Sequence, residues 1–519
     1  MNGEIMRKVV TALALFALSL AAAACGSSGG SSGGSETQKQ EVRVAYQEQI
    51  AGGIDPATFY AVEGDSVILS VYQTLLTYKP GTTELAPSLA TSWKVSPDGK
   101  TYTFQLRKGV KFQDGTEMDS AAVKQSFERE IALKGAPSYM LAQVKAIRTP
   151  SPQAVEIELN EPLAAFLDYN ASMYGPKIVS PKALKEHAGD DEAAGWLSEH
   201  ADGTGPFVLA SYKPTGPIVL ERFDGYWGKK AKPAKVEITI VPSIGDQLLQ
   251  LRSGQLNLIT HGIEPSQLKS LESDPSLQVQ TFDEAIIRTT MLINTTKPPF
   301  DDLATRRAFV ADLDSAASVE QVYGDTATPA EDVLPSSLLD ASQDPLPDPG
   351  PVVPAPTSKE VTLAYTNIAT DLRQLAELMQ QSLEESGWKV KLRADSIETQ
   401  FGYLADPSSA PNAALAVLNP DAAHPAAWLE PLYATEGGLN VFGFSDPKLD
   451  EELAAARVEP DETKSEALYG QAAKTAGEDF SVIPLAEKSE VMVAGENLTG
   501  LTYTPTYLFT VDYADLSEK

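Results

Sequence analysis

The chain of 519 residues contains a single cysteine, Cys25, and this residue limits how the fold can be held together. One thiol cannot form a disulfide or a cysteine-based metal cluster within a single chain, so the folded part must depend on packing. The cysteine ends an apolar run, Val9 to Ala24, that follows Arg7 and Lys8. At roughly 16 residues the run is shorter than the ~20 that cross a bilayer, so it predicts a signal peptide over 1–24.

A flexible tether follows the apolar run. Glycine and serine alone make up residues 26–35, a composition typical of flexible linkers, and the tether is predicted over 25–40. The position of Cys25 resembles the modified cysteine of bacterial lipoproteins, with Ala22 where leucine is more common. A diacylglyceryl thioether and an N-acyl group would supply the two or more chains that stable anchoring requires. An ordinary secreted protein, or a buried structural cysteine, is the alternative.

The remaining residues, 41–519, exceed what one hydrophobic core usually serves, so two or more lobes are expected. The whole chain carries a formal charge of -30, and removing Glu4, Arg7 and Lys8, which sum to +1, leaves -31. Such acidity argues against nucleic acid and against anionic membranes as partners. It is typical of a surface that keeps the protein soluble.

Short strands alternate with amphipathic helices, which predicts a mixed α/β fold. Every second residue is apolar over 42–46 and again over 102–106, as in strands with one buried face. Apolar residues recur every four positions at Val123, Phe127 and Ile131, as on a helix that faces a core.

The later part of the chain repeats this alternation. A strand is predicted over 236–241, followed by a helix that closes at Gly254 in the left-handed conformation. A strand, a helix and a strand over 361–392 indicate a second α/β lobe. Asp446 is the expected N-cap of a further helix. The proline-rich stretch 341–357 is predicted to be an exposed surface loop.

Sequence motifs for catalysis or metal binding are missing. The four histidines never fall at the spacing that lets two imidazoles share a metal on a helix; they are His187, His200, His261 and His424. The nucleophile-elbow match at 26–30 lies in the tether and lacks the strand-turn-helix context. The stretch 203–206 lacks the lysine of a phosphate-binding loop. No enzymatic activity, catalytic residue, cofactor or metal is therefore predicted.

A series of short motifs occurs in order along the chain. The longest covers Leu85 to Thr116 and includes SPDGK and TYTFQLRKGVKFQDGT. Later motifs are GTGPF (203–207), LRSGQ (251–255), PFDD (299–302), FSDP (444–447) and IPL (483–485). This set resembles the peptide-, dipeptide- and nickel-binding receptors of ABC importers called solute-binding protein family 5, over nearly the whole chain after the tether.

The resemblance implies a two-lobed fold of the periplasmic-binding-protein type with a hinged cleft. The first lobe would comprise 41–290 and 486–519, with an extra subdomain over 76–202, and the second lobe 291–485. Two crossing strands, over 286–294 and 482–493, would form the hinge.

The resemblance also implies where the ligand binds, in the segment LNPDAAHPAAWL at 418–429. By this match Asp421 receives the α-ammonium group of a peptide, which needs a charged partner once it is desolvated. Leu418 stands where an aromatic residue is common, and His424 where an acidic or polar one is. The expected ligand-binding residues are Asp421, Leu418, Asn419, His424 and Trp428. The stretch 47–53 is expected at the cleft edge, and a loop cap is the alternative role for Asp421.

The implied function is that of an extracytoplasmic binding protein of an ABC importer. It would capture a peptide between its lobes and deliver it to permease subunits, as a monomer anchored to the cell membrane by a lipid on Cys25. Alternatives with the same fold bind a metal chelate, which His424 would favour, an oligosaccharide or another small metabolite. A peptide-sensing receptor without transport and an exported hydrolase are further alternatives.

Overall fold

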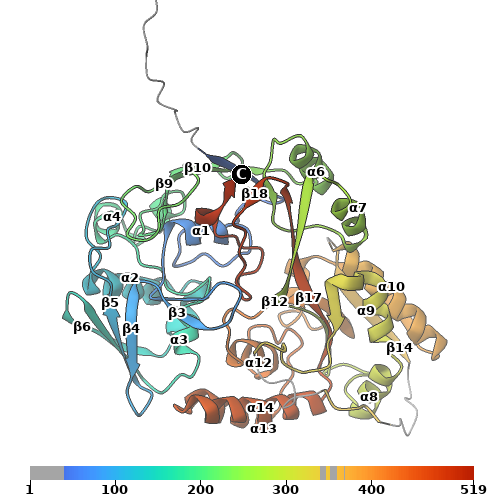
Figure 1. The fold of residues 1–519 in the computed structure, drawn as a ribbon. Helices are drawn as coiled ribbons and strands as arrows, with labels where there is room; N and C mark the ends of the chain where they lie inside the picture. The colour runs from blue at the N-terminus through green and yellow to red at the C-terminus, as the bar shows by residue number, and fades with distance from the viewer. Residues whose placement is uncertain (1–39, 339–345, 351–358, 368) are drawn as a thin grey trace, which may run out of the picture. The chain divides into compact units, whose positions relative to one another are not determined.

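The computed structural model describes residues 40–338, 346–350, 359–367 and 369–519 (Figure 1). The chain divides into two compact units, Met1–Gln38 and Lys39–Lys519, and all described residues belong to the second. The predicted signal peptide, Cys25 and nearly all of the tether lie outside the described residues, as does most of the proline-rich stretch. Within the described part of the chain, no helix is long and apolar enough to cross a membrane.

One mixed sheet of eleven strands organises the fold, in the order β15-β14-β16-β12-β17-β11-β1-β10-β9-β8, with β13 also paired to β17. Its strands are β1 (Glu41–Tyr46), β8 (Phe207–Ser211), β9 (Ile218–Arg222), β10 (Lys235–Ile240), β11 (Leu258–Ile259), β12 (Leu277–Ile293), β13 (Ala327–Pro329), β14 (Glu360–Thr366), β15 (Lys389–Asp395), β16 (Ala413–Leu418) and β17 (Val482–Gly495). Parallel pairs occur towards both ends, β1 with β10 and β14 with β15. A helix, α10, connects β14 to β15, whereas β1 and β10 are connected by a long stretch of both helices and strands, as a mixed α/β fold allows.

Two long antiparallel strands, β12 and β17, lie next to each other within this sheet. They contain the segments predicted to form the hinge, except for Asn294, which follows β12. Their register shifts between Phe282 and Ile287, where β12 has extra residues that are not paired with β17. Such a bulge bends the strand and increases its local twist. Figure 1 shows the two strands running together, with β9 and β10 on one side of them and β14 on the other.

A separate four-stranded antiparallel sheet lies within residues 76–202, in the order β4-β5-β7-β6. Its strands are β4 (Ala90–Val95), β5 (Thr101–Leu106), β6 (Val144–Ser151) and β7 (Ala154–Leu159), and a small β2 (Leu76–Tyr78) and β3 (Leu85–Pro87) pair accompanies them. The alternation in 102–106 is confirmed, because the side chains of Tyr102, Phe104 and Leu106 are all buried. The helix over 123–131 is also confirmed, as α2 (Ser120–Leu133), which Asp119 caps.

The other predicted elements are present close to their expected bounds. The helix α6 (Ile244–Arg252) ends just before Gly254, whose φ of 72° is left-handed. The strand-helix-strand unit is β14, α10 (Thr370–Glu385) and β15. Asp446 accepts hydrogen bonds from two backbone amides of α13 (Pro447–Val458), as an N-cap does.

The remaining helices lie between the strands or along their faces, and all of them except the 17-residue α14 are short. They are α1 (Asp65–Val71), α3 (Phe166–Tyr169), α4 (Pro181–His187), α5 (Ala194–Leu197), α7 (Leu268–Glu272), α8 (Leu303–Ala311), α9 (Ser315–Tyr323), α11 (Ile397–Phe401), α12 (Ala426–Tyr433) and α14 (Glu462–Glu478).

The last residues of the chain pack against the first strand. The hydroxyls of Tyr46 on β1 and Tyr513 lie 3.2 Å apart, and the amide of Val511 donates to Ser66 Oγ at 3.1 Å. Near the C-terminus, β18 (Leu498–Thr499) pairs with β19 (Ser517–Glu518). The region around β1 is therefore built from both ends of the described chain.

The two predicted lobes are in contact on the side of α13 and α14. The amide of Ala164 donates to the carbonyl of Arg457 at 2.9 Å. A Cβ added to Gly99, whose φ is +67°, would lie 2.8 Å from Pro460 Cβ, so this approach needs a glycine. The largest apolar cluster accordingly contains residues of both predicted lobes, for example Phe127 and Trp428.

Candidate ligand-binding site

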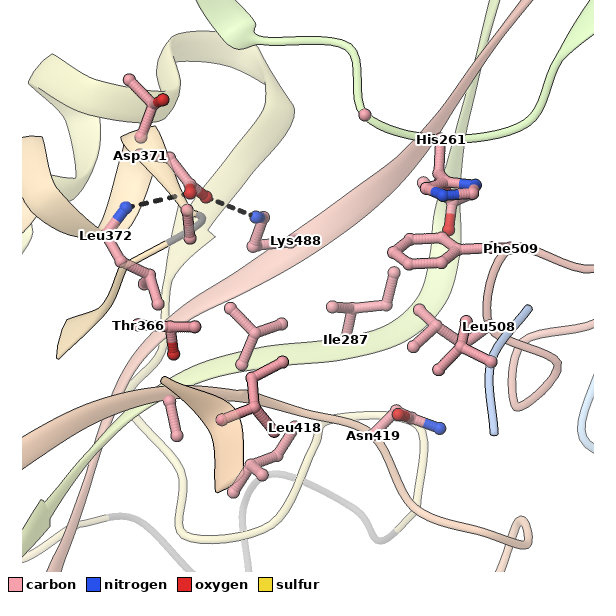
Figure 2. A pocket seen from close by; sticks show the side chains of 18 of the residues that line it. His261, Ile287, Thr366, Asp371, Leu372, Leu418, Asn419, Lys488, Leu508 and Phe509 are labelled. Atoms are coloured by element: carbon pink, nitrogen blue, oxygen red, sulfur yellow. Dashed lines mark hydrogen bonds and ion pairs between the residues drawn. The ribbon is translucent and has the colours of Figure 1, made fainter. Parts of the chain in front are cut away.

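A cavity of about 590 Å³ lies beside the crossing strands β12 and β17, and residues of both predicted lobes line it (Figure 2). Ile287 of β12 and Lys488 of β17 contribute from the crossing strands, and most of the other side chains around it are apolar. Predominantly apolar walls with a few placed polar groups are typical of small-molecule sites. The cavity is therefore the candidate ligand site.

One end of the cavity holds an ion pair. Lys488 Nζ lies 2.8 Å from Asp371 Oδ2, and the amide of Leu372 donates to Asp371 Oδ1 at 2.9 Å. Burial opposes ionisation of Asp371, but Lys488 overcomes it and holds the pKa of this carboxyl below its usual value. The carboxylate also lies in the first turn of α10, where the helix dipole favours negative charge. Lys488 Nζ is 4.9 Å from the ring centroid of Tyr323.

The other end of the cavity is aromatic. The ring of His261 stacks on Phe509 with centroids 4.5 Å apart and planes 11° from parallel, and Figure 2 shows this pair across the cavity from Asp371. His261 Nε2 lies 3.3 Å from Glu63 Oε1. Burial raises the pKa of Glu63, but the hydrogen bond and charge of His261 outweigh it, so the net pKa is lowered.

The predicted cleft edge contributes Gln47 to the cavity lining. Its side chain lies so close to Gly262 that a Cβ there would meet Gln47 Oε1 at 2.5 Å. The φ of +84° at position 262 favours glycine, whereas the contact involves only the mobile end of the Gln47 side chain. Gln47, just after β1, therefore packs next to the backbone that follows His261.

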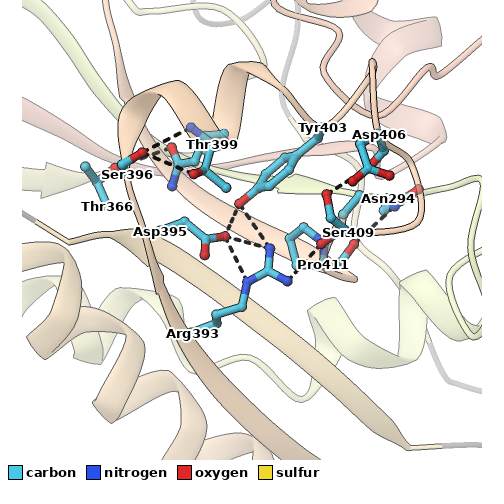
Figure 3. Close-up of polar contacts among 12 residues, drawn as sticks. Asn294, Thr366, Arg393, Asp395, Ser396, Thr399, Tyr403, Asp406, Ser409 and Pro411 are labelled. Carbon is cyan, nitrogen blue, oxygen red and sulfur yellow. Dashed lines mark hydrogen bonds and ion pairs between the residues drawn. The ribbon is translucent and has the colours of Figure 1, made fainter.

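A polar network supports the wall formed by the second predicted lobe (Figure 3). The guanidinium of Arg393 at the end of β15 donates to Asp395 Oδ2 at 2.6 and 2.9 Å, and the hydroxyl of Tyr403 donates to the same oxygen. Arg393 also donates to the carbonyl of Ser409 at 2.8 Å. Because Tyr403 lines the cavity, the network fixes part of its wall.

The predicted segment 418–429 enters the site only with its first residues. Leu418 ends β16, and both Leu418 and Asn419 line the cavity. Figure 2 shows their side chains on the side opposite Asp371 and His261. The strand β16 pairs with β12 up to this point, so the sheet determines where these two residues lie.

Asp421 lies at the boundary between the two predicted lobes. The hydroxyls of Tyr60 and Tyr139 both donate to its Oδ2, at 2.6 and 2.5 Å. Ser172 Oγ donates to the backbone carbonyl of Asp421 at 2.5 Å. Burial raises the pKa of Asp421 above its usual value, and the hydrogen bonds from Tyr139 and Tyr60 only partly offset this rise.

These partners of Asp421 come from the first predicted lobe, and no sequence motif indicated them. Tyr60 packs against Tyr174 with ring centroids 4.5 Å apart, and Tyr139 packs edge-on against Tyr169 at 5.6 Å. Aromatic packing thus orients both hydroxyls towards the carboxylate. They lie 361 and 282 residues away from it along the chain.

Trp428 is packed in the interior and His424 is partly buried, and neither is among the residues that line the cavity. His424 Nδ1 accepts the amide of Ala426 at 3.1 Å, and burial lowers the pKa of the imidazole to about 4. Trp428 is 2% exposed and donates through Nε1 to the carbonyl of Val333 at 3.1 Å. In the described residues, no group of three or more His, Cys, Asp or Glu could hold a metal ion.

A sheet that continues through both lobes, two crossing strands and a cavity walled from both sides define a binding protein that encloses a small ligand. The chain belongs to the bacterial extracellular solute-binding proteins of family 5, whose model matches residues 84–440. This confirms the resemblance of the sequence motifs, and it makes the protein an extracytoplasmic binding protein.

Curated relatives cover most of the chain. The chain is 28% identical over 475 residues to the probable D,D-dipeptide-binding periplasmic protein DdpA of Escherichia coli, across 87% of this chain and 89% of that protein. It is 28% identical over 453 residues to the glutathione-binding protein GsiB of Salmonella typhimurium, across 82% of this chain and 85% of that protein.

Solved structures share the fold. DppA from Helicobacter pylori, in complex with the peptide STSA, aligns with a TM-score of 0.79 and 24% identity over 93% of this chain and 99% of that chain. NikA from Brucella suis, in complex with Fe(III)-EDTA, aligns with a TM-score of 0.80 and 21% identity over 92% of this chain and 100% of that chain. The predicted two-lobed binding-protein fold is thereby confirmed.

Proposed function

We propose that this protein captures short peptides between its two lobes and delivers them to the permease of an ABC importer. Relatives named for binding D,D-dipeptides and glutathione support peptides as the ligand class. The cavity of about 590 Å³ lies within the roughly 300–1,000 Å³ usual for small-ligand sites.

The observation that carries the proposal is the environment of Asp421. Both phenols donate to Oδ2, and no described residue donates to Oδ1, so one carboxylate oxygen is open to a ligand. A peptide α-ammonium group would donate to it in a partly desolvated place, where charge-assisted hydrogen bonds are strong. The cation would also stabilise the ionised carboxylate, which burial disfavours here.

The substrate class can be tested by isothermal titration calorimetry on the tether-free protein. The panel should hold di- to pentapeptides, the same peptides N-acetylated, nickel chelates and oligosaccharides. We expect binding of the free-amine peptides and a loss of roughly a hundredfold or more on acetylation, because acetylation removes the charged partner of Asp421. Binding of a chelate or a sugar, with no peptide binding, would overturn the peptide assignment while keeping the fold.

The proposal includes a membrane anchor at Cys25 and a monomeric protein without catalytic activity. Metabolic labelling with a radioactive fatty acid should mark the wild-type protein and not Cys25→Ser, which should be released from cells.

A peptide recovered unchanged after prolonged incubation with the protein would agree with binding alone, and hydrolysis of the peptide would contradict it. Loss of peptide uptake on deletion of a candidate permease would identify the transporter, whereas unchanged uptake after every such deletion would favour a sensing role.

A further inference from the structure

A buried carboxyl group on the crossing strand has no role in the site described above. Glu490 of β17 lines the cavity and is 3% exposed. Its Oε1 accepts the amide of Val491 at 3.2 Å, whereas Oε2 has no hydrogen-bond partner among the described residues. Leaving a buried polar atom unpaired is costly, and such atoms are rare in folded proteins. Because Glu490 lines the cavity, a ligand bound there could supply the missing partner.

The charges around the cavity favour a cationic partner. Its lining contains three carboxyl groups, those of Glu264, Asp371 and Glu490, and Lys488 is its single lysine or arginine among the described residues. That lysine is engaged by Asp371 and lies over the ring of Tyr323. A ligand cation would therefore meet two carboxyl groups, those of Glu264 and Glu490, whereas an anion would meet no unpaired lysine or arginine in the described wall.

We infer that Glu490 is a second anchoring residue of the cleft, which binds a basic side chain of the peptide and makes the protein prefer peptides that carry one. The inference rests on the proposed function and names its substrate class more closely. Its site differs from that of Asp421, which would hold the α-ammonium group and is not among the residues that line the cavity.

The groups around Glu490 do not compensate a negative charge on its carboxyl group. Burial raises the pKa of Glu490 to about 8, while the amides of Val491 and Phe509 and the charge of Lys488 partly oppose the rise. Tyr503 is the other titratable group coupled to it, and its own pKa is raised by burial and by Glu490 and Glu284. Near neutral pH the carboxyl therefore keeps its proton until a cation displaces it, so binding of a basic side chain should release a proton.

Three tripeptides that differ only in the central side chain test this inference. They are Ala-Lys-Ala, Ala-norleucine-Ala and Ala-Glu-Ala, which present an ammonium group, an uncharged chain of similar length and a carboxylate. We expect calorimetry on the wild-type protein to show the lysine peptide binding about tenfold or more tightly than the norleucine peptide, and the glutamate peptide binding most weakly. Equal binding of the lysine and norleucine peptides would overturn the inference.

A pair of matched variants assigns the preference to one residue. Glu490→Gln keeps the size of the side chain and should bring the lysine-to-norleucine ratio close to one, without changing the loss caused by N-acetylation. The control is Glu130→Gln on α2, because Glu130 is 2% exposed, burial raises its pKa to about 8, and it does not line the cavity. This control should keep the wild-type ratio. Thermal unfolding of both variants checks that they are folded.

The outcomes separate the inference from the proposed function. A lysine preference that persists in Glu490→Gln would overturn the role of Glu490 and leave the peptide receptor intact. Equal weakening of the lysine and norleucine peptides in that variant would show a hydrogen bond to the peptide backbone instead of selection for a cation. No binding of any of the three peptides would overturn both statements together.

Discussion

The segment 418–429 was predicted as one ligand-binding stretch, but its first and last residues lie in different environments. Leu418 and Asn419 line the cavity, and Asp421 meets tyrosines of the other predicted lobe. A few residues later, Trp428 is packed in the interior and His424 is partly buried away from the cavity. A family motif therefore combines residues that contact ligand with residues that hold the loop in place. Four predictions test this division, from the largest expected effect to the smallest.

Trp428→Ala should destabilise the fold by about 3–5 kcal/mol, because it removes a large buried side chain and leaves a cavity. The affinity of the folded protein for peptide should change little. Chemical denaturation and calorimetry measure the two quantities. The control is Trp196→Ala, since Trp196 is only partly buried and stacks on His187 and His200. A large loss of affinity with unchanged stability would place Trp428 at the ligand.

Asp421→Ala should show the opposite pattern. We expect the affinity for free-amine peptides to fall by roughly a hundredfold or more, corresponding to about 3–5 kcal/mol, because the ligand ammonium loses its charged partner in a partly buried place. Stability should change much less than in Trp428→Ala. Asp421→Asn keeps the shape and removes the charge, so it should also bind weakly. Lowered stability with unchanged affinity would mean that Asp421 only caps its loop.

His424 makes stability depend on pH. Its pKa is lowered by burial to about 4, below the ordinary value of 6.5, so the unfolded chain binds the proton more readily. Above pH 6.5 the imidazole is neutral in both the folded and the unfolded chain, so its contribution to stability is complete. As the pH falls from 6.5 to 4, the unfolded chain binds the proton first, and up to roughly 3 kcal/mol of stability is lost. His424→Gln should flatten this part of the profile in thermal unfolding at graded pH. The surface variant His187→Gln should keep the wild-type profile.

Tyr60→Phe and Tyr139→Phe should have the smallest effects. Each removes one hydrogen bond to Asp421 Oδ2 and leaves the other, so a change of about 0.5–1.5 kcal/mol in peptide binding is expected for each variant. The double variant should lose more than either single variant, since the carboxylate then has no phenol partner. Calorimetry with one tripeptide compares all three, and unchanged binding in the double variant would mean that the phenols do not orient the carboxylate.

Much of the fold could be predicted from local patterns. Alternating apolar residues correctly placed β1 and β5, the spacing of Val123 and Phe127 placed α2, and Asp446 was found as an N-cap. These features depend on neighbours within a few residues, so the sequence carries them directly. The motifs also identified the family, because several of them occur together in one order along the chain.

The residues of the site were harder to predict from the sequence, because they meet only in the folded chain. Lys488 and Asp371 are separated by 117 residues, and Asp421 meets its tyrosines across even longer distances. Burial patterns identify an inward-facing residue but do not say whether it faces a core or a cavity. Trp428 and Glu490 illustrate both cases, since each is almost fully buried and only Glu490 lines the cavity.

The contact between β1 and the C-terminal residues has a consequence for the order of events during synthesis. Tyr46 is made early, but its partner Tyr513 follows 467 residues later, and Val511 follows Ser66 by 445 residues. Domains usually fold as units while the chain grows, yet this region cannot close until these distant residues have been made. A newly made chain would therefore stay incompletely folded until they appear, which suits a protein that must cross a membrane before it takes its final form.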